Sequence, residues 1–239
     1  MRAASVQFSN ITVDLRGATR LHGLTHTLSG TGITALVGSN GAGKSLLLKV
    51  LHGLIPITRG QVRWAKDLAG ERRALMRQQP DFLRRSVQEN LVFALEINGW
   101  KSNQARVRSE EMLDWMQLEQ SANLMANTLS PGERSRLAMA RALAIEPAVL
   151  LLDEPTASLD PESALAMESV ISFVQDRGTK VILVSHSLGQ VRRLASDVLM
   201  LDQGQSIFFG PTDKFFSNPG NPRASAFLHG AGFSLDEAV

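Results

Sequence analysis

Hydrophobic and polar positions follow two different rhythms along this 239-residue chain. The opening stretch alternates polar and apolar residues through positions 5–8 and 11–15, with Asn10 between the two segments. Alternation with a period of two is typical of strands that bury one face. We therefore expect short strands and a small antiparallel sheet at the start of the chain.

Three later runs are short and continuously apolar, at residues 33–37, 149–152 and 181–184. Polar residues or glycine follow each run, as in fully buried parallel strands. The runs predict three neighbouring strands of one central sheet. Together with the opening stretch and the strands' surroundings, they predict an α/β core formed by residues 1–80 and 145–210.

Between Phe82 and Ala144 the pattern changes to helical spacing. Residues 112, 113 and 116 are apolar, whereas residues 110, 111 and 114 are acidic and lie on the other side of a helix. This predicts a helical subdomain, residues 81–144, inserted into the core. In the tail, residues 211–239, prolines precede an apolar segment around Phe227 and Leu228, which predicts a docked terminal helix.

Composition narrows the class of protein only slightly. The chain is 44% hydrophobic and 20% charged, as in an ordinary globular protein, and its net charge of +2 is too small to predict nucleic-acid binding. It contains no cysteine, which excludes disulfides and a cysteine nucleophile. No window approaches the roughly 18 apolar residues of a membrane span. We expect any membrane role to be exerted through a partner.

A phosphate-binding loop is predicted at residues 38–45, which read GSNGAGKS and satisfy the pattern GxxxxGKS. The loop follows a predicted strand and precedes a helix expected to begin near Leu46. Glycines let backbone N–H groups approach phosphate, Lys44 reaches the β- and γ-phosphates, and the Ser45 hydroxyl binds Mg²⁺. The loop alone leaves kinases, GTPases and recombination ATPases open. The predicted nucleotide contacts are Gly38, Ser39, Asn40, Gly41, Ala42, Gly43, Lys44, Ser45 and Leu46.

A second motif narrows the family. Residues 129–143, LSPGERSRLAMARAL, resemble the LSGGQ signature and following helix of ATP-binding-cassette (ABC) ATPases. Ser130 is the predicted N-cap, with Pro131 at the first helical position and Glu133 completing a capping box. Free N–H groups at a helix start bind phosphate. The resemblance implies that Ser130, Gly132 and Glu133 contact the γ-phosphate bound to an opposite cassette, although Pro131 and Glu133 replace the usual glycine and glutamine.

The hydrolytic residues are also implied by this resemblance. Asp153 and Glu154 follow an apolar run like the Walker B motif, so that Asp153 would hold Mg²⁺ and Glu154 would act as general base for the attacking water. His186 matches the switch histidine that touches the γ-phosphate. Gln78 matches the Q-loop glutamine in the Mg²⁺ and water shell, with the adjacent Gln79 as the alternative.

Two departures concern other contacts of the nucleotide. The family usually stacks an aromatic residue on adenine, but here Leu15 is the candidate, and Leu46 replaces a threonine or serine. Stacking is worth about 1 to 3 kcal/mol, so we expect modest affinity and weak base selectivity. Asp160, within the stretch PTASLD, resembles a D-loop residue at a dimer interface, but it is equally explained as a helix cap.

The resemblance implies a P-loop NTPase of the ABC cassette type, with a RecA-like core, an N-terminal antiparallel sub-sheet and a helical subdomain. It implies ATP and Mg²⁺ as cofactors, a second cassette as homodimer partner, and no nucleic acid. It also implies a permease that docks near Asp81 to Asn90, a substrate-binding protein acting indirectly, and a place at the cytoplasmic face of the membrane. The segments KSLLL, FLRRSVQENL and FFSNPGNPRASAFLHG are most similar to tungstate and phosphate uptake ATPases. Tungstate is favoured; phosphate, another small solute and a soluble non-transport ATPase stay open.

Overall fold

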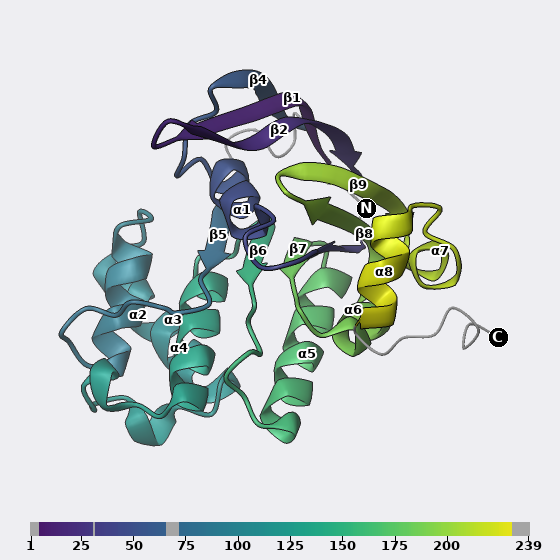
Figure 1. The fold of residues 1–239 in the computed structure, drawn as a ribbon. Helices are drawn as coiled ribbons and strands as arrows, with labels where there is room; N and C mark the ends of the chain where they lie inside the picture. Colours follow the sequence, from purple (N-terminus) through teal and green to yellow (C-terminus); the bar gives the residue numbers. More distant parts are fainter. Residues whose placement is uncertain (1–4, 31, 66–71, 231–239) are drawn as a thin grey trace.

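The computed structural model describes residues 5–30, 32–65 and 72–230, and it contains two sheets (Figure 1). A three-stranded sheet has the order β2-β1-β4, and a six-stranded sheet has the order β5-β6-β7-β3-β8-β9. Helices cover the larger sheet on both sides. This is the α/β architecture, with an antiparallel sub-sheet, that the sequence predicts.

The small sheet consists of β1 (Val6–Leu15), β2 (Ala18–Leu28) and β4 (Arg59–Trp64), paired antiparallel as expected. The two short strands expected at its start are one continuous strand, β1. Its pairing is irregular next to Asn10, which has a φ of 50°. A bulge of this kind inserts an unpaired residue without ending the strand. The break in alternation therefore marks a bulge rather than a loop.

The three apolar runs form neighbouring parallel strands at the centre of the large sheet, which confirms that prediction. They are β3 (Ile33–Val37), β6 (Val149–Asp153) and β7 (Lys180–Val184), and every residue in them is buried. Strands β5 (Arg73–Met76) and β8 (Ala195–Asp202) extend the parallel order, and β9 (Gln205–Pro211) pairs antiparallel with β8. The catalytic loops predicted above follow β3, β6 and β7, so they meet at one edge of the sheet.

The two faces of the large sheet pack against different partners. Alternate residues such as Leu151 and Ile182 contact α1 (Lys44–His52) and the small sheet, whereas Leu150 and Leu183 contact the helices on the other face. Those helices are α2 (Val87–Glu96), α3 (Ser102–Trp115), α4 (Pro131–Ala144) and α5 (Pro161–Asp176), with short 3₁₀ turns η1 (Glu119–Ser121) and η2 (Ala126–Thr128) between α3 and α4. Helices α2, α3 and α4 pack together beside the sheet, where the helical spacing predicts a helical subdomain.

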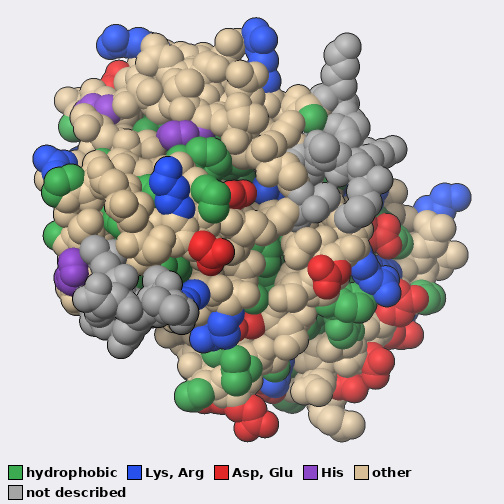
Figure 2. Space-filling view, turned by 90° about the vertical axis from the view of Figure 1, so that its right-hand side faces the viewer, with side chains coloured by type: hydrophobic (Ala, Val, Ile, Leu, Met, Phe, Trp, Pro, Cys, Tyr) green, Lys and Arg blue, Asp and Glu red, His purple; other side chains and the backbone are tan. Residues whose placement is uncertain are grey.

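The end of the described chain packs against β8 and β9. Helices α6 (Leu188–Leu194), α7 (Thr212–Ser217) and α8 (Pro222–Gly230) share a core with these strands, and α8 contains the predicted terminal helix around Leu228. Residues 231–239 of the predicted tail lie outside the described residues. The face that carries α7 and α8 shows scattered acidic and basic side chains (Figure 2). Among the described residues, no helix has the length and hydrophobicity to cross a bilayer.

Candidate functional site

The glycine-rich loop connects β3 directly to α1. Gly38, Gly41 and Gly43 have φ values of 140°, 80° and 104°, which glycine adopts without the strain that a side chain would bring. Because left-handed Gly43 ends the loop, α1 begins at Lys44 rather than near Leu46 as expected. The first N–H groups of α1 therefore follow the loop immediately, as in an anion-binding helix start.

Lys44 is folded back against this loop and is 6% exposed. Its Nζ donates hydrogen bonds to the carbonyl oxygens of Gly38 at 2.8 Å and Ser39 at 2.9 Å. Burial lowers the pKa of Lys44, while the carboxylates of Glu154 and Asp153 act in the opposite direction. The ammonium group thus lies beside the loop and donates to carbonyl oxygens, which phosphate oxygens can replace as acceptors.

Ser45 and Asp153 lie next to each other at the start of α1 and the end of β6. The Ser45 Oγ donates to Asp153 Oδ1 at 2.9 Å. A hydroxyl and a carboxylate oxygen suit Mg²⁺, which typically takes one or two protein ligands and completes its octahedron with phosphates and water. The pair therefore fits a Mg²⁺ ion that arrives with a nucleotide.

The carboxylate of Glu154 contacts two other residues of the predicted site. Its Oε2 accepts a hydrogen bond from Gln78 Nε2 at 3.0 Å, and its Oε1 lies 3.0 Å from His186 Nε2. Glu154 has a φ of 52°, and its N–H donates to the carbonyl oxygen of Val184 in the neighbouring strand. This geometry places Gln78, rather than Gln79, against the predicted base.

A cleft of about 480 Å³ is lined by the phosphate loop, including Lys44 and Ser45, and by Gln78, Glu154 and His186. The same cleft is also lined by Leu15 and Leu46, which the sequence singles out, and by three residues that no motif marks: Arg20, Lys49 and Ile55. They come from β2, α1 and the segment after α1, so only the fold brings them together. Lys49 alone carries a sequence signal, since it follows Ser45 by one helical turn.

The signature segment begins α4 in the way that the sequence predicts. Ser130 is the N-cap, its Oγ accepts from the Glu133 N–H at 3.3 Å, and Glu133 Oε2 accepts from the Ser130 N–H at 3.0 Å. The Ser130 Oγ also donates to Glu133 Oε2 at 2.7 Å, and the Ser121 hydroxyl donates to Oε1. Hydrogen bonds from these two serines hold the pKa of Glu133 below its usual range. The capping box and Pro131 at the first turn are confirmed.

The structure does not bring the signature residues to the phosphate loop. Ser130, Gly132 and Glu133 are absent from the described lining of the cleft that contains Lys44. Gly132 lies beside Leu159 in the segment that precedes α5, and the adjacent Pro131 lines a separate cavity together with Gln78 and Ser158. Asp160 caps α5 by accepting from the N–H groups of residues 162 and 163, which confirms the helix cap. Its role at a dimer interface stays a prediction.

A buried polar network connects the turns that carry Glu154 and His186. Gln190, on α6, donates to Thr156 Oγ1 at 3.0 Å and to Glu168 Oε1 at 3.2 Å. Arg193 binds both carboxylate oxygens of Glu168, which is 6% exposed. The sequence offers no signal for this network because its members come from α5, α6 and the turn after β6. It fixes α6, which begins two residues after His186, relative to the turn that follows Glu154.

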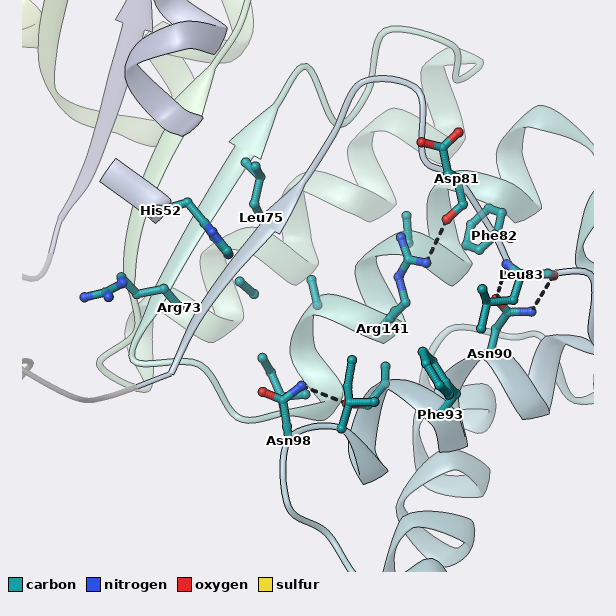
Figure 3. A pocket seen from close by; sticks show the side chains of 16 residues that line it. His52, Arg73, Leu75, Asp81, Phe82, Leu83, Asn90, Phe93, Asn98 and Arg141 are labelled. Atoms are coloured by element: carbon teal, nitrogen blue, oxygen red, sulfur yellow. Dashed lines mark hydrogen bonds between the residues drawn. The ribbon is translucent and has the colours of Figure 1, made fainter. Parts of the chain in front are cut away.

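A second cavity of about 450 Å³ lies between β5, α2 and α4, away from the phosphate loop (Figure 3). Its wall includes Phe82, Leu83 and Phe93, with Arg73 and Arg141 as cations. Arg141 NH1 donates to the carbonyl oxygen of Asp81 at 2.8 Å, and Asn90 donates to that of Leu83. Part of the segment 81–90 thus forms one side of an open, mostly apolar groove.

Comparison with known proteins agrees with the geometry. A sequence profile described as ABC transporter matches residues 21–157, more than half of the chain. This chain belongs to the ABC transporter family. The ABC ATPases most similar to it include the tungstate uptake system ATP-binding protein TupC of Peptoclostridium acidaminophilum, 34% identical over 215 residues that cover 88% of this chain and 99% of that protein.

Two further relatives have other cargo in their names. The phosphate import ATP-binding protein PstB of Bacteroides fragilis is 31% identical over 249 residues, covering 93% of this chain and 98% of that protein. The methionine import ATP-binding protein MetN of Bradyrhizobium diazoefficiens is 31% identical over 209 residues, covering 82% and 60%. The chain is thus an ATP-binding ABC ATPase of the importer type, whose hydrolysis of ATP is coupled to transport.

Proposed function

We propose that this ABC ATPase powers the uptake of tungstate through a separate membrane permease, with phosphate or another small solute as the alternative cargo. The observation that carries the proposal is the near full-length similarity to the tungstate uptake ATPase TupC. The cargo itself is bound by other subunits. The fold supports a motor that couples a hydrolytic cleft to a partner-binding groove.

The cleft supplies each group that hydrolysis requires. Glu154 accepts a proton from water as the water oxygen bonds to the γ-phosphorus and the bond to the leaving ADP oxygen breaks. Lys44 and the N-terminus of α1 stabilise the phosphate charge, and Ser45 and Asp153 hold Mg²⁺. Gln78 and His186 already occupy both carboxylate oxygens of Glu154. Each carboxylate oxygen keeps a further acceptor site for the attacking water, and release of His186 from Glu154 would let its ring contact the γ-phosphate.

Two copies are needed to complete each site in this proposal. Ser130 and Gly132 begin a helix whose free N–H groups suit phosphate, yet they lie outside the cleft of their own chain. A head-to-tail homodimer would bring the signature helix of one copy over the phosphate loop of the other. The negative charge of Glu133 is partly neutralised by three hydrogen bonds from Ser130 and Ser121, so it would weaken this contact only partly.

The permease would dock in the groove of Figure 3 and hold the cassette at the cytoplasmic face of the membrane. Leu83 and Ile97 are 40% and 66% exposed at this groove, and both would be buried by an apolar helix. Residues 81–144 would act as the helical subdomain, moving with the permease relative to the core. A substrate-binding protein would act on the permease rather than on this chain.

The proposal is tested by measuring metal uptake in cells that lack the gene. Tungsten content after exposure to tungstate should fall and should be restored by the unaltered gene but not by Glu154→Gln. Loss of phosphate uptake with unchanged tungsten content would assign the phosphate alternative. Failure of the chain to co-purify with any membrane permease would instead support the soluble, non-transport ATPase.

A further inference from the structure

The cleft has a base-facing end whose chemistry is unusual for a nucleotide site. When the triphosphate lies along Lys44 and Ser45, the base must extend toward Leu15, Arg20, Lys49 and Ile55. These side chains are two aliphatic groups and two cations. Among the described residues that line the cleft, none carries an aromatic ring apart from His186, which contacts Glu154. The base therefore requires another kind of planar or charged partner.

The backbone of Arg20 is fixed directly beside the phosphate loop. The N–H of Gly204 donates to the carbonyl oxygen of Ala42 at 3.0 Å, and the Gly204 carbonyl accepts from the N–H of His22 at 2.9 Å. A side chain at position 204 would be impossible, because its Cβ would lie 2.3 Å from the carbonyl oxygen of Arg20. The β8–β9 turn thus ties β2 to the loop and gives Arg20 a defined place over the cleft.

The side chain of Arg20 is exposed and is free to bind a ligand. It makes no hydrogen bond or ion pair with another residue that the structure describes. It also lies over no described aromatic ring, unlike Arg141, which lies over Phe82. A planar guanidinium stacks on aromatic faces, and its N–H groups match two adjacent acceptors.

We propose that Arg20 is the residue that contacts the nucleotide base, by stacking its guanidinium on the base face, and that this ATPase consequently accepts GTP as well as ATP. Stacking of a guanidinium does not discriminate between purines, because both present a similar aromatic face. The inference rests on the nucleotide site proposed above and adds the group that holds the base.

The test compares Arg20→Ala with the unaltered chain for three ligands, ATP, GTP and inorganic tripolyphosphate, by isothermal titration calorimetry with Mg²⁺. Loss of a cation–π contact should raise the Kd for ATP and GTP by about three- to thirtyfold. The Kd for tripolyphosphate should stay unchanged because it has no base. Arg16→Ala is the matched control: it removes the same charge from the same hairpin at a position outside the cleft, and it should alter none of the three values.

A second substitution tests the assignment from the opposite direction, by restoring a stacking partner. Adding an aromatic residue in the Arg20→Ala background, as Leu15→Tyr, should restore nucleotide affinity without changing tripolyphosphate binding. An equal loss for all three ligands would show that Arg20 contacts phosphate, and unchanged values for all three would show that it contacts nothing; both results overturn the assignment. A clear preference of the unaltered chain for either purine nucleotide would overturn the predicted equal acceptance of ATP and GTP. Failure of the unaltered chain to bind either nucleotide would overturn the proposed site itself.

Discussion

At the scale of single residues, Glu154 has a strained backbone and a carboxylate that other site residues already contact. Its left-handed conformation costs on the order of 1 to 3 kcal/mol in a residue with a side chain, and the hydrogen bond from its N–H to β7 maintains it. The strain turns the side chain away from the sheet and toward Gln78 and His186. The sequence pattern indicates an acidic pair after a strand, but it does not distinguish this bend from a simple continuation of the strand.

Lys180 is a second residue whose environment has a measurable effect, on stability rather than on ATP hydrolysis. It is fully buried at the start of β7, where its Nζ donates to the Gly32 carbonyl and the Thr34 hydroxyl. Burial lowers the pKa of Lys180 to about 8, against the weaker opposing effect of Asp197. Below pH 8 the lysine is charged in both the folded and unfolded chain, so the folded state bears the full cost of burying that charge.

We therefore predict that stability rises with pH above about 8. Between pH 8 and the unfolded-state pKa near 10.4, the folded state loses its proton first, and the free energy of unfolding should rise by up to about 1.4 kcal/mol per pH unit. Urea unfolding at several pH values measures this slope, and the chain has no tyrosine or cysteine that would titrate in the same range. Lys180→Met should reduce the slope, leaving a smaller part from Lys44, whereas exposed Lys101→Met should preserve it. An unchanged slope in Lys180→Met would contradict the assignment.

At the scale of elements, two helices begin with the same capping box but differ in their proposed roles. Ser86 and Glu89 cap α2 as Ser130 and Glu133 cap α4. Ser86→Ala and Ser130→Ala should each lower the free energy of unfolding by about 1 kcal/mol. Only Ser130→Ala should also slow ATP turnover, by about ten- to a hundredfold, because it removes a hydrogen bond to phosphate. Chemical denaturation and phosphate release measure the two effects, and equal turnover in the two variants would remove Ser130 from the site.

The groove and the signature helix are joined through one aromatic ring. The guanidinium carbons of Arg134 and Arg141, two turns apart on α4, lie 5.5 Å and 4.9 Å from the centre of the Phe82 ring. Arg134 also donates to the Pro80 carbonyl, and Arg141 to that of Asp81. A partner that moves Phe82 therefore moves α4, whose first residues form the signature.

This connection predicts that Phe82→Ala lowers transport more than it lowers ATP hydrolysis. Leu83→Ala, which removes an exposed contact from the same groove, should act in the same direction. Both rates are measured on the cassette reconstituted with its permease in vesicles, and the ratio of solute moved to ATP hydrolysed is compared. Phe209→Ala, on β9, is the control for loss of a partly exposed ring. Unchanged ratios in both groove variants would remove the docking assignment.

The elements that the sequence predicts well are those specified by local patterns. Continuous apolar runs identify β3, β6 and β7, and the order of Ser130, Pro131 and Glu133 identifies the start of α4. Arg20 and Ile55 are different, because their presence in the cleft depends on how the small sheet packs on α1. Likewise, Glu168 and Arg193 are ordinary helix residues until α5 and α6 come together. Local motifs can therefore be predicted from the sequence, whereas contacts between distant elements are known only once the fold is known.

At the scale of the whole molecule, the separation between the phosphate loop and the signature helix predicts that two copies of the chain assemble. Each 26.0 kDa chain contains both halves of the proposed site, but Ser130 and Gly132 do not line the cleft that contains Lys44. A symmetric head-to-tail pair forms two complete sites and closes without leaving an unmatched half. Removing the proposed base should trap this pair, because ATP then stays bound and continues to hold the two copies together.

We predict that Glu154→Gln binds ATP and Mg²⁺, forms a dimer of twice the monomer mass, and hydrolyses ATP at least about a hundredfold more slowly than the unaltered chain. Light scattering after size-exclusion chromatography measures the mass, and phosphate release measures the rate. Glu119→Gln, an exposed glutamate in η1, is the matched control and should hydrolyse ATP normally. Unaltered hydrolysis by Glu154→Gln would contradict its role as base. A variant that stays monomeric while ATP is bound would contradict the pairing, because the signature helix would then have no phosphate to contact.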